Sequence, residues 1–64
     1  MTKEEAMEEL IALAPLTDKD TGVYARRRKL WLFLDEQGVS QTDIAKMSKV
    51  GRSDVNKVVK QWKH

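Results

Sequence analysis

Residues 40–60 read SQTDIAKMSKVGRSDVNKVVK, and the apolar residues in this stretch recur at the three- and four-residue spacing of amphipathic helices. Two short helices joined by a tight turn account for the pattern. Five apolar residues would form their inward faces and fill the turn: Ile44, Ala45, Val50, Val55 and Val58. We therefore expect one helix over about 41–48 and another from Arg52 or Ser53 to about Trp62.

The second of these helices leaves a set of polar residues on its outward side: Arg52, Ser53, Asn56, Lys57 and Lys60. Side chains of these types form hydrogen bonds with base edges and phosphates. The stretch resembles the helix-turn-helix of the Cro and λ-repressor type of phage and bacterial regulators. In that family a Gln opens the first helix, an apolar residue and Ala follow, and the turn and second helix hold an apolar residue, a Ser and a Val. The matching residues here are Gln41, Ile44, Ala45, Val50, Ser53 and Val55.

Two residues depart from that family's pattern. Lys49 stands at the turn position that is usually Gly, and Ser48 stands at the usually apolar position before it. A Lys at that position would carry a left-handed backbone at a cost on the order of 1 kcal/mol. Gly51 lies close enough in the sequence to supply the unusual φ instead.

The resemblance implies that the first turns of the second helix reach base edges in the major groove. Arg52 is the strongest candidate, because a bidentate Arg to guanine is the commonest specific contact, although contact with phosphate alone is the alternative. Asn56 would pair with adenine, bond phosphate or remain in solvent. Ser53 would read a base, touch phosphate or cap the helix. Asp54 would be repelled by DNA, so we expect it to pair with a basic group or to cap the helix.

The other implied contacts are with phosphates, roughly four to six per protomer. Gln41 resembles the family's Gln that contacts the DNA backbone and steadies the recognition helix. The lysines that border that helix are Lys46, Lys49, Lys57 and Lys60. Residues 26–29, RRRK, wrap around a helix, so only about two of them face DNA at once. Arg27 and Arg28 are the candidates, and the other two would pair with the acidic N-terminal segment or stay in solvent.

Two longer helices are predicted before this motif. Thr2 followed by Glu5 is a capping-box pattern that starts a helix over 2–14. The apolar stripe of this helix comprises Ala6, Met7, Leu10, Ile11 and Ala14. A second helix runs over about 20–37 and stops at Gly38.

The run LWLFL at residues 30–34 is apolar without a break, so neighbouring elements must cover it on most sides. A strand is conceivable here, but the charged residues on either side favour a helix. We place this helix at the centre of an all-α, four-helix domain spanning 1–64, with Trp31 and Phe33 in the core. Trp62 either closes the core over the N-terminal helix or supplies a dimer contact.

Charge is segregated along the chain. Residues 1–22 carry two basic and six acidic side chains, a net charge of −4, whereas residues 23–64 carry ten basic and four acidic ones, a net charge of +6. A basic body with an acidic cap predicts that one side meets phosphate and the other faces away. The alternative is that both are ordinary solvated helix surfaces.

Composition argues against several classes of function. The chain has no Cys and a single His, His64, so a His-based metal site and a Ser-His or Cys-His nucleophile are both excluded. We expect no enzyme activity and no cofactor or metal. No apolar run approaches the roughly 18 residues of a membrane span, so we expect a cytoplasmic protein without a membrane partner.

These observations predict a sequence-specific double-stranded DNA-binding protein of the phage or mobile-element type. It would act as a homodimeric repressor on a two-fold related operator, without a small-molecule ligand. Two alternatives stay open. One is a helical protein-interaction adaptor that uses the acidic helix or Trp62, and the other is an architectural or recombination-accessory protein that bends DNA.

Overall fold

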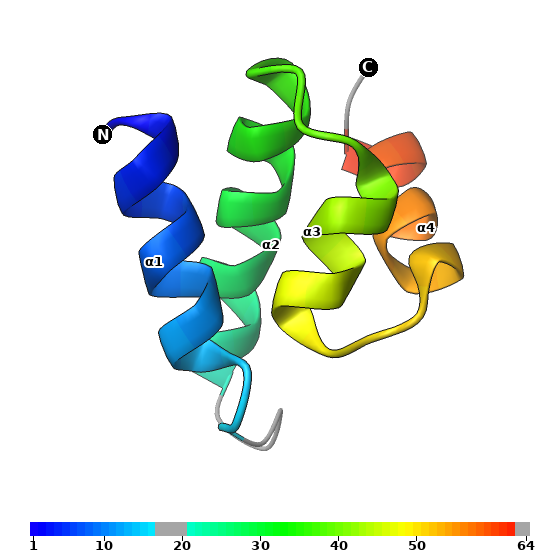
Figure 1. Cartoon of the computed structure of the whole chain (residues 1–64). Helices are drawn as coiled ribbons and strands as arrows, with labels where there is room; N and C mark the ends of the chain where they lie inside the picture. The colour runs from blue at the N-terminus through cyan, green and yellow to red at the C-terminus, as the bar shows by residue number, and fades with distance from the viewer. Residues whose placement is uncertain (17–20, 63–64) are drawn as a thin grey trace.

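The computed structural model describes residues 1–16 and 21–62. Within these residues the chain forms four helices and no strand, so the predicted all-α class is confirmed (Figure 1). The helices are α1 (Lys3–Leu13), α2 (Thr21–Glu36), α3 (Gln41–Ser48) and α4 (Arg52–Trp62). The predicted start of the second helix at residue 20 and the single His, His64, lie outside the described residues.

Helix α1 begins at the predicted capping box. The Glu5 amide donates to the Thr2 hydroxyl at 3.2 Å, and the Thr2 amide donates to the Glu5 carboxylate at 2.9 Å. The helix ends one residue earlier than predicted, because the amide of Ala14 bonds the carbonyl of Ile11 in a tighter three-residue turn. The hydrogen bond that the Glu5 carboxylate accepts from the Thr2 amide holds the pKa of Glu5 below its ordinary value.

Helix α2 ends at Glu36, one residue before the predicted end, and Gly38 terminates it as predicted. Gly38 has a φ of 87°, which places it in the left-handed region. The amide of Val39 bonds the Leu34 carbonyl at 3.0 Å, and the amide of Gly38 bonds the Asp35 carbonyl at 3.1 Å. These two bonds satisfy carbonyls at the helix end in a Schellman motif, which turns the chain toward α3.

Ser40 caps α3 by accepting the Asp43 amide at 3.2 Å, and the helix ends at the left-handed residue Lys49 with a φ of 58°. The amide of Val50 then bonds the Ala45 carbonyl at 3.1 Å. The alternative in which Gly51 takes the unusual backbone is wrong, since Gly51 does not have a positive φ. Lys49 therefore carries the left-handed conformation itself, at a cost of about 1 kcal/mol.

All four helices contribute to one buried cluster: Ala6, Leu10, Leu30, Trp31, Leu34, Ile44, Ala45, Val55, Val58 and Val59. The predicted core positions on α3 and α4 are confirmed, as is Trp31. Phe33 and Val50 are partly buried and pack against the cluster. Ile11 is 55% exposed, so its prediction as part of the buried stripe is wrong. The contact face of α1 is centred on Ala6 and Leu10, which places Ile11 beyond its edge.

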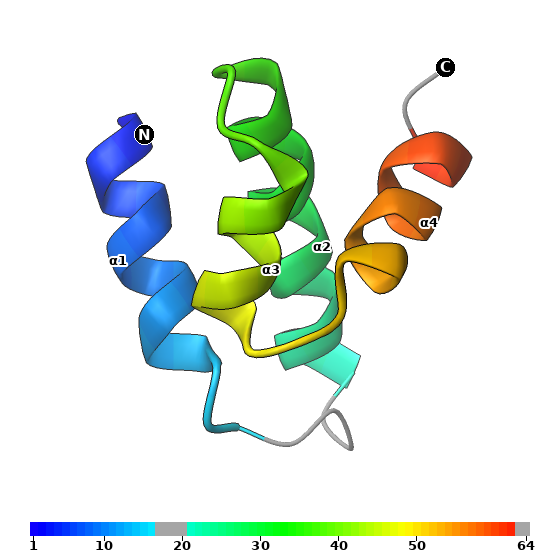
Figure 2. The same cartoon turned by 45° about the vertical axis from the view of Figure 1, so that its right-hand side comes forward.

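Helices α1 and α4 lie on opposite sides of the molecule, with α2 and α3 between them (Figures 1 and 2). Each of the outer helices packs against both α2 and α3, and α1 does not contact α4 within the described residues. This arrangement confirms that the acidic helix is remote from α4. The packing of α1 on α3 was not expected from the sequence. None of the helices of the described residues combines the length and apolar character needed to cross a membrane.

Candidate functional site

Helix α4 has two distinct sides. Its buried residues are Val55, Val58 and Val59, and these hold the helix against α2 and α3. Its exposed residues include the five polar residues that we call the α4 outer face: Arg52, Ser53, Asn56, Lys57 and Lys60. The helical period thus places the residues that pack against α2 and α3 on one side of α4 and the exposed polar residues on the other, as the sequence predicts.

Three residues of the α4 outer face lie together at the N-terminal half of the helix. Arg52, Ser53 and Asn56 line one open depression of about 340 Å³. These are the three residues predicted to read bases. The depression combines a guanidinium, a hydroxyl and a carboxamide, so it offers both donors and acceptors of hydrogen bonds.

The predicted phosphate contacts near α4 are accessible. Lys46 on α3, Lys49 in the link, and Lys57 and Lys60 on α4 are all exposed. Gln41 is the first residue of α3 and is partly buried. Lysines on both helices and on their link therefore give the α3 and α4 part of the molecule exposed positive charge.

Arg26, in the basic run of α2, pairs with α1. Its guanidinium donates to both carboxylate oxygens of Glu9, with Nη2 at 2.7 Å from Oε1. This contact lowers the pKa of Glu9 and raises the pKa of Arg26. The expectation that part of the run pairs with the acidic helix is confirmed.

Arg27 is buried, with 4% of its surface exposed, and its prediction as a phosphate contact is wrong. Its Nη2 donates to the carbonyls of Leu13 at 2.9 Å and Leu16 at 3.3 Å, at the end of α1. The last turn of α1 has no basic residue of its own, so a cation from α2 meets these carbonyls. In the sequence, the only sign that Arg27 would bind these carbonyls was the lack of a Lys or Arg in the last turn of the helix that precedes Pro15.

Arg28 lies between two aromatic side chains. Its guanidinium carbon is 4.3 Å from the ring centre of Trp62 and 5.4 Å from that of Tyr24. This contact stacks α2 on the end of α4. The phosphate contact of Arg28 stays a prediction, since Arg28 is partly exposed. Trp62 is 51% exposed and lies against α2, so the expectation that it closes the core over α1 is wrong.

A buried hydrogen bond between α2 and α3 was missed by the sequence analysis. The indole nitrogen of Trp31 donates to the Ser48 hydroxyl at 2.7 Å, and this hydroxyl donates to the Ile44 carbonyl at 2.9 Å. Ser48 is the polar residue that departs from the apolar pattern of the resembled family. A core Trp needs an acceptor for its N–H group, so Trp31 and the unexpected Ser48 together could have predicted this hydrogen bond.

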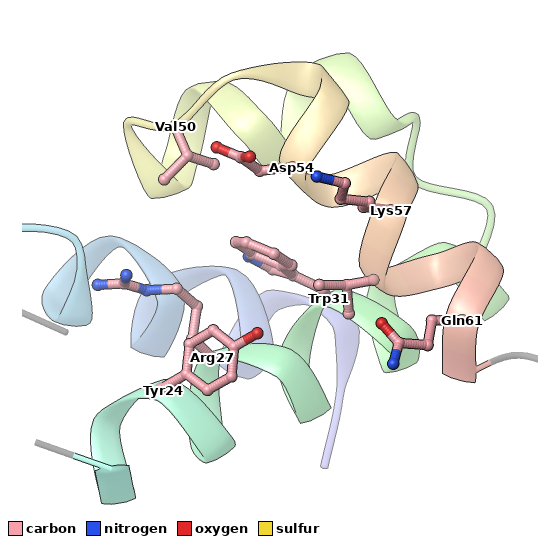
Figure 3. Close-up of a pocket in the computed structure, with 8 residues that line it drawn as sticks. Tyr24, Arg27, Trp31, Val50, Asp54, Lys57 and Gln61 are labelled. Carbon is pink, nitrogen blue, oxygen red and sulfur yellow. The ribbon is translucent and has the colours of Figure 1, made fainter.

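A groove of about 300 Å³ lies between α2 and α4, and it has no lining residue in common with the depression of Arg52, Ser53 and Asn56 (Figure 3). The side chains of Tyr24, Arg27 and Trp31 come from α2, opposite Val50, Asp54 and Lys57. Asp54 is exposed and faces this groove instead of the depression that Arg52 lines. The acidic side chain is therefore kept away from the candidate base-reading residues.

Within the described residues, no group of three His, Cys, Asp or Glu side chains is placed to hold a metal ion. Comparison with known proteins finds no family model, no curated protein and no solved structure that matches this chain. The candidate site is therefore defined by its own residues: the depression on the α4 outer face and the exposed lysines of α3, α4 and their link.

Proposed function

We propose that this protein binds double-stranded DNA through the α4 outer face and acts as a sequence-specific transcriptional repressor. The observation that carries the proposal is the common depression lined by Arg52, Ser53 and Asn56 on the exposed N-terminal half of α4. Arg and Asn are the side chains best suited to guanine and adenine edges. These side chains are separate from the buried valines that pack α4 against α2 and α3.

The arrangement of α3 and α4 supports insertion of α4 in the major groove. A groove about 12 Å wide admits one α-helix, and a helix-turn-helix places the first turns of its second helix against the base edges. In this pose Gln41, at the start of α3, would contact the DNA backbone. Lys46 and Lys49 would meet the phosphates on the α3 side, and Lys57 and Lys60 those beside α4.

The charge distribution supports the same pose. Helix α1 carries all four acidic side chains of residues 1–16, and it lies on the side of the molecule opposite α4. Its charges are therefore held away from the phosphates. The ion pair of Glu9 with Arg26 further reduces the field that α1 would exert on DNA.

Repression would follow from occupation of a promoter by a homodimer on two related half-sites. Selection of bound sequences from a random duplex pool tests this function most directly. We expect recovery of a motif with two half-sites whose centres are about one helical turn apart. Recovery of no motif, together with no binding to any duplex, would contradict the proposal and favour the protein-interaction alternative.

The salt dependence of binding tests the phosphate contacts separately. Four lysines per protomer predict a slope of log affinity against log salt of roughly −3 to −4 per protomer. Lys57→Ala should reduce this slope by about one unit. Lys3→Ala is the matched control, because Lys3 is on α1 and far from α4. Pronounced bending of the duplex on binding would favour the architectural alternative.

A further inference from the structure

The groove between α2 and α4 has the size and lining of a site for a small ligand. Its volume of about 300 Å³ lies at the lower end of the range for such sites. Its inner wall is apolar, because Trp31 and Val58 are buried and Val50 is partly buried. The exposed side chains that line it are polar or phenolic: Tyr24, Asp54, Lys57 and Gln61.

The polar groups of these four exposed side chains are available to a ligand. Asp54 and Lys57 carry opposite charges three residues apart on α4, yet neither forms an ion pair within residues 1–16 and 21–62. The Tyr24 hydroxyl and the Gln61 carboxamide point into the space between the helices, and neither makes a hydrogen bond within the same residues (Figure 3). The groove therefore offers one anion, one cation and two neutral hydrogen-bonding groups.

The two arginines nearest the groove are engaged elsewhere. Arg27 lines the groove, but its guanidinium donates to the carbonyls of Leu13 and Leu16, at the negative end of the α1 dipole. Arg28 does not line the groove and lies over the rings of Tyr24 and Trp62. Asp54 and Lys57 are therefore the charges that a ligand in the groove would contact.

We propose that the groove binds a free α-amino acid with an apolar side chain, and that this ligand releases the protein from DNA. The ammonium group of the ligand bonds Asp54, and its carboxylate bonds Lys57. Its side chain lies against the apolar inner wall, which includes Trp31. No small-molecule ligand was expected from the sequence, because the groove is built from helices that are distant in the chain.

Ligands with one sign of charge fit the groove less well. A carboxylic acid would satisfy Lys57, but it would set its negative charge near Asp54 and leave that carboxylate without a partner. An amine would fail at Lys57 for the same reason. Side chains three residues apart on a helix are neighbours, so an ammonium and a carboxylate on one carbon atom match Asp54 and Lys57 together.

Lys57 links this site to DNA, and this part of the proposal rests on the proposed function. Lys57 is one of the lysines proposed to contact phosphate, and it also lines the groove. An ammonium group bonded to the ligand's carboxylate loses its contact with a phosphate. The ligand and DNA therefore weaken each other's binding by the same factor. The ligand acts as an inducer, which ends repression when the amino acid accumulates.

Nuclear magnetic resonance titration of the isotope-labelled full chain tests the site. The ligands added in turn are L-valine, L-leucine, L-isoleucine, L-methionine, L-phenylalanine and L-tryptophan. For at least one of them we expect saturable shifts at the Trp31 indole and at the amides of Val50 and Asp54, and none at Ile11 on α1. The absence of saturable shifts in the groove with all of these ligands would overturn the proposal.

Analogues of the best ligand test the two ion pairs. The matching carboxylic acid lacks the ammonium group, and the matching amine lacks the carboxylate. We expect each analogue to bind about tenfold or more weakly than the amino acid, because a site with placed polar groups rejects a ligand that lacks their partners. Equal binding of either analogue would show that the ligand is not recognised as an α-amino acid.

A substitution at Asp54 tests the same recognition from the side of the protein. Asp54→Asn keeps the shape of the side chain and removes its charge, so we expect it to bind the amino acid about tenfold more weakly. Asp43→Asn is the matched control, because Asp43 is an exposed carboxylate in the first turn of α3 and does not line the groove. Circular dichroism checks that both variants keep their helicity. Unchanged binding by Asp54→Asn would overturn the assignment of the ammonium site.

Fluorescence anisotropy with a bound duplex tests the release from DNA. We expect saturating ligand to lower the duplex affinity about fivefold near 0.15 M salt and to reduce the salt slope by about one unit, which is the loss of one phosphate contact. It should not change the duplex affinity of Lys57→Ala. An unchanged or increased affinity of the wild type would overturn the release. If the ligand shifts the groove signals but no duplex binds, the proposed function is wrong and the amino-acid site stands.

Discussion

The indole N–H of Trp31 donates a hydrogen bond to the hydroxyl of Ser48 over 2.7 Å, and this bond joins the middle of α2 to the last residue of α3. Both residues are buried, with 4% and 2% of their surfaces exposed. The link that carries α4 begins at the next residue, Lys49. The bond therefore holds the end of α3 in place, directly before the link that leads into α4.

Removal of the Ser48 hydroxyl should destabilise the fold. Ser48→Ala leaves the Trp31 N–H buried without its acceptor, which should cost about 1–3 kcal/mol of unfolding free energy. Ser53→Ala is the control, because Ser53 is exposed on α4 and its loss should stay within about 0.5 kcal/mol. Urea denaturation followed by tryptophan fluorescence measures both. Equal stability of the two variants would show that the buried bond contributes nothing.

Arg52 and Lys60 should differ in what they contribute to DNA binding. Arg52→Ala should weaken specific binding by about 1–3 kcal/mol and relax the preference at one base-pair position. Lys60→Ala should weaken binding to all duplexes similarly, since a phosphate contact carries no sequence information. Fluorescence anisotropy with matched and mismatched duplexes distinguishes the two effects. An unchanged sequence preference in Arg52→Ala would remove Arg52 from the base-reading residues.

The left-handed backbone at Lys49 offers a route to a more stable protein. Lys49→Gly should raise the unfolding free energy by no more than about 0.6 kcal/mol, because relief of about 1 kcal/mol of strain is offset by about 0.4–1 kcal/mol from the greater freedom of the unfolded chain. Lys46→Gly is the control within α3 and should lower the unfolding free energy by about 1 kcal/mol. Thermal melts at low salt compare the three proteins. Destabilisation by both substitutions would contradict the strain at Lys49.

The ion pair between Glu9 and Arg26 should make stability depend on pH. Arg26 holds the pKa of Glu9 below its ordinary value, so the folded state binds this proton less readily than the unfolded chain does. The contribution is complete above the unfolded pKa of about 4.3 and is lost as the pH falls through the lower folded value. The two side chains are 41% and 36% exposed, so the effect should be small and should weaken with salt.

Comparison of Glu9→Gln with the wild type measures this contribution. The variant should melt at a lower temperature than the wild type at pH 7, and this difference should shrink as the pH falls through the lowered folded pKa of Glu9. Glu8→Gln is the control, since Glu8 is exposed on the same helix. A difference in melting temperature that persists unchanged at pH 2 would show that the charge of Glu9 has no part in it.

The helices were predictable because their signals are local. The capping box at Thr2 and the glycine stop at Gly38 depend on residues within a few positions of each other, and both were confirmed. The apolar period likewise identified Ile44, Ala45, Val55 and Val58 as buried, but it missed Val59 and the polar Ser48. Ile11 was misplaced because the edge of the contact face of α1 depends on how α2 lies against it, which the period alone does not specify.

The roles of the basic residues were less predictable, because they depend on contacts between distant segments. Arg26, Arg27 and Arg28 are consecutive, yet each has a different partner: a carboxylate of α1, the carbonyls at the end of α1, and a pair of aromatic rings. Sequence shows that these charges exist but not which helix faces each of them. By contrast, Arg52, Ser53 and Asn56 were placed together correctly, because they lie within about one turn of a single helix.

The residues that α4 presents to solvent are separate from those that hold it in place. Val55, Val58 and Val59 are its buried residues, whereas Arg52, Ser53 and Asn56 are exposed. Substitutions at exposed positions usually change stability by no more than about 0.5 kcal/mol. Descendants of this chain can therefore diverge at Arg52, Ser53 and Asn56 without compensating changes in the interior. A library randomised at the same three positions should consist mostly of folded proteins.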